Sequence, residues 1–261
     1  MPLESIAPAD LDTSDAQWQA RVDLAAAHRL AVMHGLHEGI FNHLTLRVPG
    51  HSDRYYQIPF GLHWSEVTAS CFMEVAYADG KVLAGEGLVE RSCYCIHAPI
   101  HELVPHGDTV LHTHMPFGSA LARLEDQSIL PIGQTELGTM MEVAYDDTYA
   151  GPAFDPAEGE RLARLTGEKT VLMMANHGAA TIGRSVAEAY DLLYYLERAA
   201  QVQLYAMWTG RPLRRIPQPV IDASMKEFAA DRDLYGGKHA CEWHFDALKR
   251  LLDKREPDYR Q

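Results

Sequence analysis

The feature that most constrains the fold is a buried strand followed closely by a long amphipathic helix. Residues 170–174 have the apolar pattern of a strand covered on both faces. A capping box then begins at Ser185, with Glu188 as its partner, and Gly210 marks the end of the helix. The apolar stripe of this helix consists of Val186, Tyr190, Leu193, Leu196, Ala200 and Leu204. Such a stripe needs an apolar surface to cover, so we predict a sheet with helices packed on it.

Further strand and helix patterns extend this arrangement over most of the chain. Short strand-like runs occupy residues 44–48, 56–59, 73–77 and 109–113. Helices are expected after Ser14, over about residues 89–103 and after Asp155-Pro156. Because the strands come in hairpin-like pairs between helices, the sequence predicts an α/β or α+β fold with a substantial sheet.

Domain organisation and charge restrict what the protein can bind. No repeat or Pro/Gly/Ser linker interrupts residues 14–261, which we expect to form a single domain after a loose leader at 1–13. The formal net charge of -13 repels phosphate backbones and anionic lipids, so no nucleic-acid or membrane partner is expected. No apolar run approaches the ~20 residues that cross a bilayer. The first residues resemble no targeting signal, so we predict a cytoplasmic protein with free cysteines.

Two histidines on the predicted strand at 109–113 give the first chemical signal. His112 and His114 are two residues apart, so on a strand their side chains point to the same face. The preceding residues are apolar, and buried imidazoles need partners. Two histidines on a half-exposed strand would be the alternative. We interpret the pair as ligands of a metal ion.

A third histidine follows the other core strand. His177 lies between Asn176 and Gly178, directly after the predicted strand at 170–174. A histidine at a strand end, beside a glycine that relaxes the backbone, can point into a site, although it can also be a plain turn residue. Three histidines on one ion leave an open coordination position, which is typical of a catalytic metal.

A rival cluster lies on the predicted helix at 89–103. It has a ligand-type side chain at every fourth residue, at Cys93, His97 and His101. Side chains at this spacing can share one helix face. Pro99 stands among them and predicts an irregular helix. The alternative is a polar-edged helix packed on the sheet, which we prefer for His101.

Taken together, these motifs resemble the class II aldolase/adducin family over about residues 18–204. The segment 41–47, Phe-Asn-His-Leu-Thr-Leu-Arg, resembles the family's Gly-Asn-x-Ser-x-Arg loop, and 58–62 resembles its Pro-x-Gly turn. His112-Thr113-His114 matches the family's His-x-His, and Asn176-His177-Gly178 matches its third-histidine motif. The capped helix at 185–189 matches the segment that follows. The ordered set is far more specific than any one motif.

The resemblance implies a fold, a cofactor and an assembly. The family fold is a three-layer α/β/α arrangement around a central, largely antiparallel sheet. The resemblance also implies one divalent metal ion on three histidines, zinc first among Zn, Mn, Fe and Co. It further implies a homo-oligomer, expected to be a tetramer, that acts on a small-molecule substrate.

The chain departs from the sugar-phosphate aldolases of the family at the acid/base and phosphate positions. Their catalytic glutamate corresponds to Cys93, which is either a weak acid/base or a packed core residue. One of their phosphate-binding serines corresponds to Arg91, whose planar fork suits a carboxylate. The alternative for Arg91 is a solvated side chain paired with Glu86 or Glu90. We therefore expect a substrate other than a sugar phosphate.

These departures lead to a prediction of function. We expect a metal-dependent carbon–carbon lyase, a decarboxylase or retro-aldol enzyme, for a small, aromatic hydroxy or carboxy compound. The expected substrate-binding residues are Arg91, Asn42, Phe60 and Gly61, with Trp64 and Tyr94 as further aromatic positions. Tyr145 is a candidate proton donor or a core residue. The alternatives are a non-haem iron oxygenase on the same histidines and a non-catalytic, adducin-like interaction domain.

Overall fold

One eight-stranded sheet forms the centre of the protein. The computed structural model describes residues 15–230 and 235–261. The strands are β1 (His43–Arg47), β2 (Arg54–Gln57), β3 (Met73–Ala76), β4 (Val82–Ala84), β5 (Thr109–Thr113), β6 (Val143–Asp146), β7 (Val171–Met174) and β8 (Ala179–Gly183). Their order is β4-β3-β2-β1-β5-β8-β7-β6, and every neighbouring pair in it is antiparallel except β6 with β7. The predicted α/β fold with a largely antiparallel sheet is confirmed.

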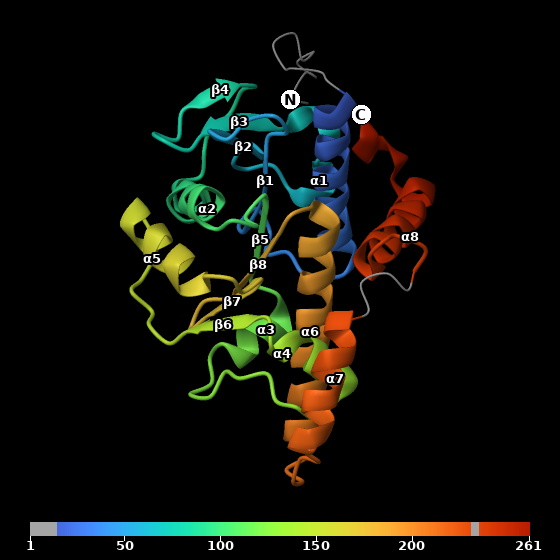
Figure 1. The fold of residues 1–261 in the computed structure, drawn as a ribbon. Coiled ribbons are helices and arrows are strands. Elements are labelled where there is room, and N and C mark those ends of the chain that lie inside the picture. Colours follow the sequence, from blue (N-terminus) through green and yellow to red (C-terminus); the bar gives the residue numbers. More distant parts are fainter. Residues whose placement is uncertain (1–14, 231–234) are drawn as a thin grey trace.

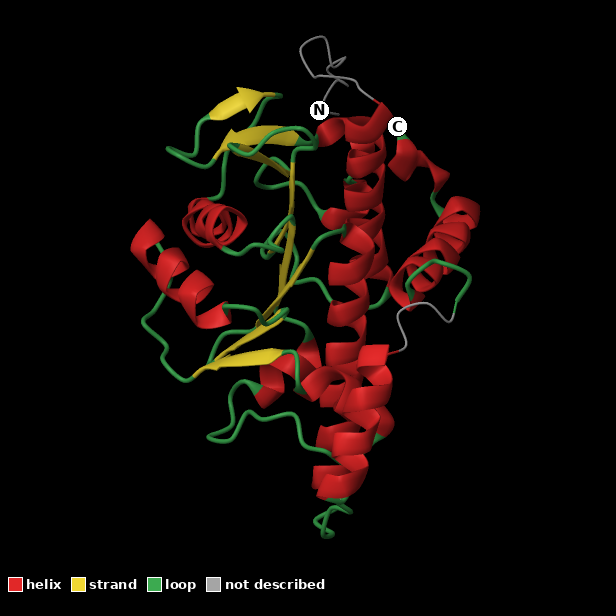
Figure 2. Cartoon of the chain, in the orientation of Figure 1, coloured by secondary structure: helices red, strands yellow, loops and turns green. Residues whose placement is uncertain are grey.

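Helices cover both faces of this sheet (Figures 1 and 2). One face carries α2 (Arg91–Leu103) and α5 (Pro156–Thr166), and the other carries α1 (Asp15–Met33) and α6 (Val186–Trp208). The remaining α-helices are α3 (Pro116–Leu121), α4 (Gln134–Met140), α7 (Gln218–Ala230) and α8 (Ala240–Arg255). Three short 3-10 helices are η1 (Trp64–Glu66), η2 (Ala69–Cys71) and η3 (Pro257–Arg260). α8 packs on α1 and α6, so helices near both ends of the described chain meet.

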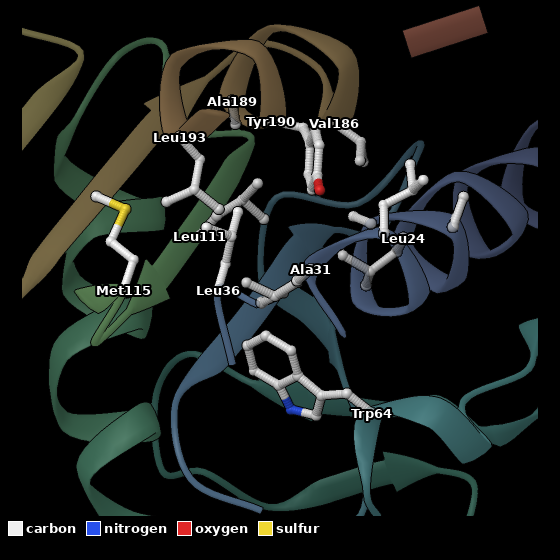
Figure 3. Close-up of a cluster of buried hydrophobic side chains, with 14 of the residues drawn as sticks. Leu24, Ala31, Leu36, Trp64, Leu111, Met115, Val186, Ala189, Tyr190 and Leu193 are labelled. Carbon is white, nitrogen blue, oxygen red and sulfur yellow. The ribbon is translucent and has the colours of Figure 1, made fainter. Parts of the chain in front are cut away.

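The largest hydrophobic core lies between the sheet and the pair α1 and α6 (Figure 3). Leu111 of β5 contributes to it from the sheet, and Leu193 and Tyr190 contribute from α6. Burial of such side chains stabilises the fold by about 1.5–3 kcal/mol each. Trp64 is fully buried in the same core, so the expectation that it lines a pocket is wrong.

The helices on the other face approach each other closely. A Cβ atom at Gly159 of α5 would collide with the carbonyl oxygen of Cys95 and would lie 2.9 Å from Cγ of Pro99, both on α2. Glycine therefore permits this crossing. Pro99 lies within α2, which runs unbroken from Arg91 to Leu103, so the proline does not end the helix.

Most of the predicted elements have counterparts within a few residues. The strand expected at 109–113 is β5, the helix expected at 89–103 is α2, and the helix after Ser185 is α6. The sequence patterns did not predict β4, β6, α3, α4, α7 or α8. The loose leader expected at 1–13 and the cap at Ser14 lie outside the described residues, and the single domain over 14–261 stays a prediction. No helix in the described ranges is long and apolar enough to span a bilayer.

Candidate metal centre

Three imidazoles converge where β5 and β7 end. His112 lies on β5, His114 follows that strand, and His177 lies in the turn between β7 and β8. The ring centroids are 5.0 Å apart for His112 and His114, and 4.8 Å from each of them to His177. One nitrogen from each ring lies within 4.8 Å of the others. The structure thus brings together the three residues that the sequence predicted as ligands.

Hydrogen bonds determine which nitrogen of each ring is available. Nδ1 of His112 donates to the carbonyl oxygen of Ala179 at 3.0 Å, since a carbonyl can only accept. Nδ1 of His114 is hydrogen bonded to the carboxylate of Glu38. In both rings Nε2 therefore keeps its lone pair, and Nε2 of His114 is buried with no partner among the described residues. A buried lone pair without a donor fits a metal ion, so these residues suit the expected cofactor.

Unusual backbone geometry positions the second of these rings. Asn42 adopts a left-handed conformation, with φ of 74°, and its Oδ1 accepts a hydrogen bond from the backbone N–H of His114 at 3.0 Å. A Cβ atom at Gly178 would lie 2.7 Å from the carbonyl oxygen of Thr113 and 2.9 Å from the ring of His114. Only glycine lets the turn that carries His177 pack this closely against the strand end.

Burial keeps the imidazoles of His112 and His177 neutral, the form that a metal ligand requires. It lowers the pKa of His112 well below the usual value, and the neighbouring His177 and His114 add to this shift. The pKa of His177 falls to about 4 for the same reasons, burial first and then the charge that His114 would carry. Neutral imidazole is the form that binds a metal ion.

A recess beside His177 contains Tyr149 in place of the expected Tyr145. Thr148, Tyr149 and His177 are among its lining residues. Tyr149 is exposed, and its ring lies 6.4 Å from that of His177. Tyr145, expected as a proton donor, points to the opposite face of the sheet, where it packs on the α1/α6 core and its hydroxyl accepts from the N–H of Ile129. We therefore leave Tyr145 out of the site.

A second recess gathers several of the residues predicted to bind substrate. It is lined by Ile40, Asn42, His43, Leu44, Gln57, Ile58, Pro59, Phe60 and Glu90. Phe60 is 40% exposed and its ring lies 6.1 Å from that of Phe41, so the two form an apolar edge beside the polar groups. Gly61, with φ of 98°, forms the turn that presents Phe60. Tyr94 lies elsewhere, over Gly80.

The acidic residue of this recess is Glu90, the N-cap of α2. Its carboxylate accepts hydrogen bonds from the N–H of Cys93 at 2.7 Å and the hydroxyl of Ser92 at 2.6 Å. Nε2 of His43 lies 3.0 Å from it. Burial raises the pKa of Glu90, but the hydrogen bonds from His43, Ser92 and the Cys93 amide outweigh it and bring the pKa to about 2.

Two further predicted site residues have positions that the sequence did not anticipate. Arg91 is exposed, and its Nε and Nη2 both donate to the carbonyl oxygen of Phe154, at 3.1 and 2.9 Å. Its guanidinium therefore holds the loop before α5, and neither Glu86 nor Glu90 pairs with it. Cys93 is fully buried, and burial raises the pKa of its thiol well above the usual value. That shift is opposite to the one an acid/base role requires.

Sequence reasoning missed four residues of this region. Glu38, which holds His114, and Tyr149, beside His177, stand in segments without a recognisable motif. His43 belongs to the loop motif at 41–47, and its place next to Asn42 is the sequence signal that points to it. Glu90 lies three residues before Cys93, and as the N-cap of α2 its side chain folds back toward Cys93.

Comparison with known proteins agrees with the fold. The family model described as "Class II Aldolase and Adducin N-terminal domain" matches residues 22–204. A Pseudomonas aeruginosa protein, named only provisionally as a class 2 aldolase, is 35% identical over 97% of both chains. The decarboxylase NovR of Streptomyces niveus is 25% identical, over 94% of this chain and 89% of its own. An aldolase II superfamily structure from Pseudomonas syringae superposes with a TM-score of 0.87 at 35% identity, covering 98% of this chain and all of that one. This chain therefore belongs to the class II aldolase/adducin family.

Proposed function

We propose that the protein is a metal-dependent carbon–carbon lyase, of the decarboxylase or retro-aldol type, for a small aromatic hydroxy or carboxy compound. The observation that carries the proposal is the set of converging imidazoles of His112, His114 and His177, which hydrogen bonding and burial hold in the ligand form. A divalent ion bound there, zinc first and Mn, Fe or Co as alternatives, would polarise a substrate oxygen and accept electron density. The similarity to a decarboxylase supports this reaction class.

Residues around the triad would contact the substrate, support the metal ligands and deliver a proton. The apolar edge of Phe41 and Phe60 offers aromatic contact for the substrate ring. The side chain of Asn42 holds the backbone of His114, so the same residue supports both the recess and the metal centre. Tyr149, on the open side of His177, is the group that could deliver a proton to the carbon from which carbon dioxide or an aldehyde departs.

Decarboxylation requires few catalytic groups from the protein. The bond between the substrate carbon and its carboxylate breaks, and its electron pair moves into the conjugated oxygen system of the substrate. The proton that then reaches the carbon comes from the Tyr149 hydroxyl, which is regenerated from water. No strong carboxylate base is needed, which agrees with the replacement of the family's catalytic glutamate by Cys93.

An anaerobic screen of hydroxylated aromatic acids tests the proposal. We expect release of carbon dioxide or of an aldehyde without oxygen. Tyr149→Phe should lower kcat by about 10²- to 10⁴-fold with unchanged metal content, whereas Tyr145→Phe, on the other face of the sheet, should leave kcat unchanged. Turnover only in the presence of oxygen would replace the lyase with the iron oxygenase. A carefully purified protein that holds no metal would favour an adducin-like interaction domain.

We further propose that the chain forms a homo-oligomer, with a tetramer as the expected state. The support is an apolar surface where α6 ends, which includes Val202, Tyr205 and Trp208, the last 71% exposed. Val220 and Phe228 of α7 are exposed as well. Monomeric proteins rarely expose large contiguous apolar patches. A monomer by light scattering at micromolar concentration would contradict the proposal.

A further inference from the structure

A second cluster of ligand-type side chains lies next to the triad. His43 of β1 stands opposite His112 of β5 in the sheet, so the two side chains share a face. Cys93 and His97, one turn apart on α2, pack over that face. The ligand atoms of His43, Cys93 and His97 all lie within 4.8 Å of one another. The ring of His112 lies 6.0 Å from that of His43 and 6.5 Å from that of His97.

A chain of hydrogen bonds determines the tautomer of His97. Nδ1 of His101 must donate to the carbonyl oxygen of Gly107, so Nε2 of His101 accepts from the Thr45 hydroxyl at 2.8 Å. That hydroxyl has a single proton, and the bond to His101 uses it in preference to the longer contact, 3.4 Å, with the carbonyl oxygen of Val110. The Thr45 oxygen must therefore accept from Nδ1 of His97, which lies 2.7 Å away. Nε2 of His97 consequently carries a lone pair.

This lone pair is buried and has no partner. His97 is 1% exposed, and its Nε2 forms no hydrogen bond with any described residue. Leaving such an acceptor unsatisfied destabilises the folded protein. An imidazole held through its Nδ1 by a polar group, with its Nε2 free of hydrogen bonds, is the arrangement that metal-binding histidines adopt. The cluster expected from the sequence thus keeps Cys93 and His97, but His43 takes the place of His101, which serves as a hydrogen-bonding support.

We propose that a second metal site, for zinc or a similar divalent ion, lies beside the triad of metal-binding histidines. Its ligands are His43, Cys93 and His97. Two imidazoles and one thiol are ligands that zinc prefers. Binding converts the Cys93 thiol to a thiolate and releases its proton to solvent. The Glu90 carboxylate, 3.0 Å from His43, adds a second negative charge, so the thiolate and the carboxylate together balance the two charges of the ion.

One side of the cluster borders a recess. His43 and Glu90 line the recess that contains Phe60. An ion bound to the cluster would join β1 to α2 and hold the residues that flank His112. The site is independent of the proposed lyase activity, because it shares no ligand with the triad.

Cobalt substitution tests the second site on the intact protein. Only this site contains sulfur, so we expect a thiolate-to-cobalt charge-transfer band in the near ultraviolet when cobalt(II) is added to the metal-free protein. The band should persist in Cys95→Ser, a matched control two residues away on α2, and in His177→Ala. It should disappear in Cys93→Ser and weaken strongly in His97→Gln.

Zinc content gives a second readout. We expect two equivalents per chain in the wild type and in Cys95→Ser, and one equivalent in Cys93→Ser or His177→Ala. Absence of the band in the wild type, with one equivalent of zinc, would overturn the second site and leave a thiol hydrogen bonded to His97. The band together with a single equivalent that His177→Ala does not change would support the second site and contradict the triad. Because the wild-type spectrum decides, a variant that fails to fold does not affect the outcome.

Discussion

The carboxylate of Glu38 is hydrogen bonded to Nδ1 of His114, although the two residues are 76 positions apart in the chain. This bond orients the imidazole and leaves Nε2 for a ligand. Outer carboxylates of this kind raise the basicity of metal-binding histidines. The relationship places Glu38 in the metal centre even though its side chain is more than half exposed.

The first prediction concerns Glu38. We expect Glu38→Gln to lower the affinity for zinc by about 10- to 100-fold, because the amide orients the His114 ring less firmly and carries no charge. Competition with a chromophoric chelator measures this affinity. Glu86→Gln, which removes an exposed carboxylate from another loop, is the control. A change below about twofold, far under that expected range, would mean that Glu38 only happens to lie beside His114.

The second prediction concerns Asn42, whose side chain and backbone have separate roles. Asn42→Ala removes the acceptor for the N–H of His114 and puts alanine, which tolerates the left-handed region less well than asparagine, at a φ of 74°, so we expect a loss of about 2–4 kcal/mol in the free energy of unfolding. Asn42→Gly removes the same acceptor, but glycine adopts the left-handed backbone without strain. The free energy of unfolding should therefore fall by about 1 kcal/mol less than in Asn42→Ala. Denaturant unfolding compares the two. Equal losses would show that the left-handed backbone contributes nothing.

The third prediction concerns Arg91, whose guanidinium holds the carbonyl of Phe154. Arg91→Ala should speed hydrogen exchange in residues 147–155 by roughly tenfold, since hydrogen bonds from a charged group are worth about 1.5–3 kcal/mol. Arg91→Lys should be intermediate, because an ammonium cannot reproduce the fork. Metal content should not change in either variant.

Kinetics separate this anchoring role from the substrate contact predicted for Arg91. If the guanidinium also binds a substrate carboxylate, Arg91→Ala should raise KM by about 10- to 150-fold for carboxylated substrates. Unchanged exchange in residues 147–155 together with a raised KM would show that Arg91 leaves Phe154 and binds the substrate instead.

The fourth prediction concerns pH and His28, which is fully buried on α1. Burial lowers its pKa to about 4 from 6.5, and the hydrogen bond to the carbonyl of Leu24 offsets only part of this shift. Above pH 6.5 the residue is neutral in the folded and unfolded states, so it does not affect stability there. Between pH 6.5 and 4 only the unfolded state gains the proton, so stability falls, by roughly 3 kcal/mol in all at about 1.4 kcal/mol per pKa unit.

Replacement of His28 should flatten this dependence. In His28→Leu the free energy of unfolding should decline less between pH 6.5 and 4 than in the wild type, because the leucine cannot be protonated in either state. Denaturant midpoints across this range measure the slope. His51→Gln, in the half-exposed turn after β1, is the control. An identical slope in His28→Leu and wild type would mean that His28 is protonated in the folded protein.

The sheet and the three converging histidines could be predicted from the sequence because their signals are local. The positions of His112 and His114 follow from the two-residue period of a strand, and the capping box before α6 follows from contacts within one helical turn. The motifs around Asn42 and His177 also gave the family, which the comparison confirmed. Burial of the strand at 109–113 was readable from its apolar neighbours, and all five of its residues are buried.

Only the tertiary structure decided which distant groups meet at this site. Tyr145 and Tyr149 differ by four positions, yet the first packs into the core behind the sheet and the second stands beside His177. No local period distinguishes them, because the strand β6 ends between them. Likewise, His43 faces Cys93 and His97 only through the pairing of β1 with β5 and the packing of α2 over both strands. Such proximity arises from sheet order and helix packing, which depend on contacts across the whole chain rather than on neighbouring residues.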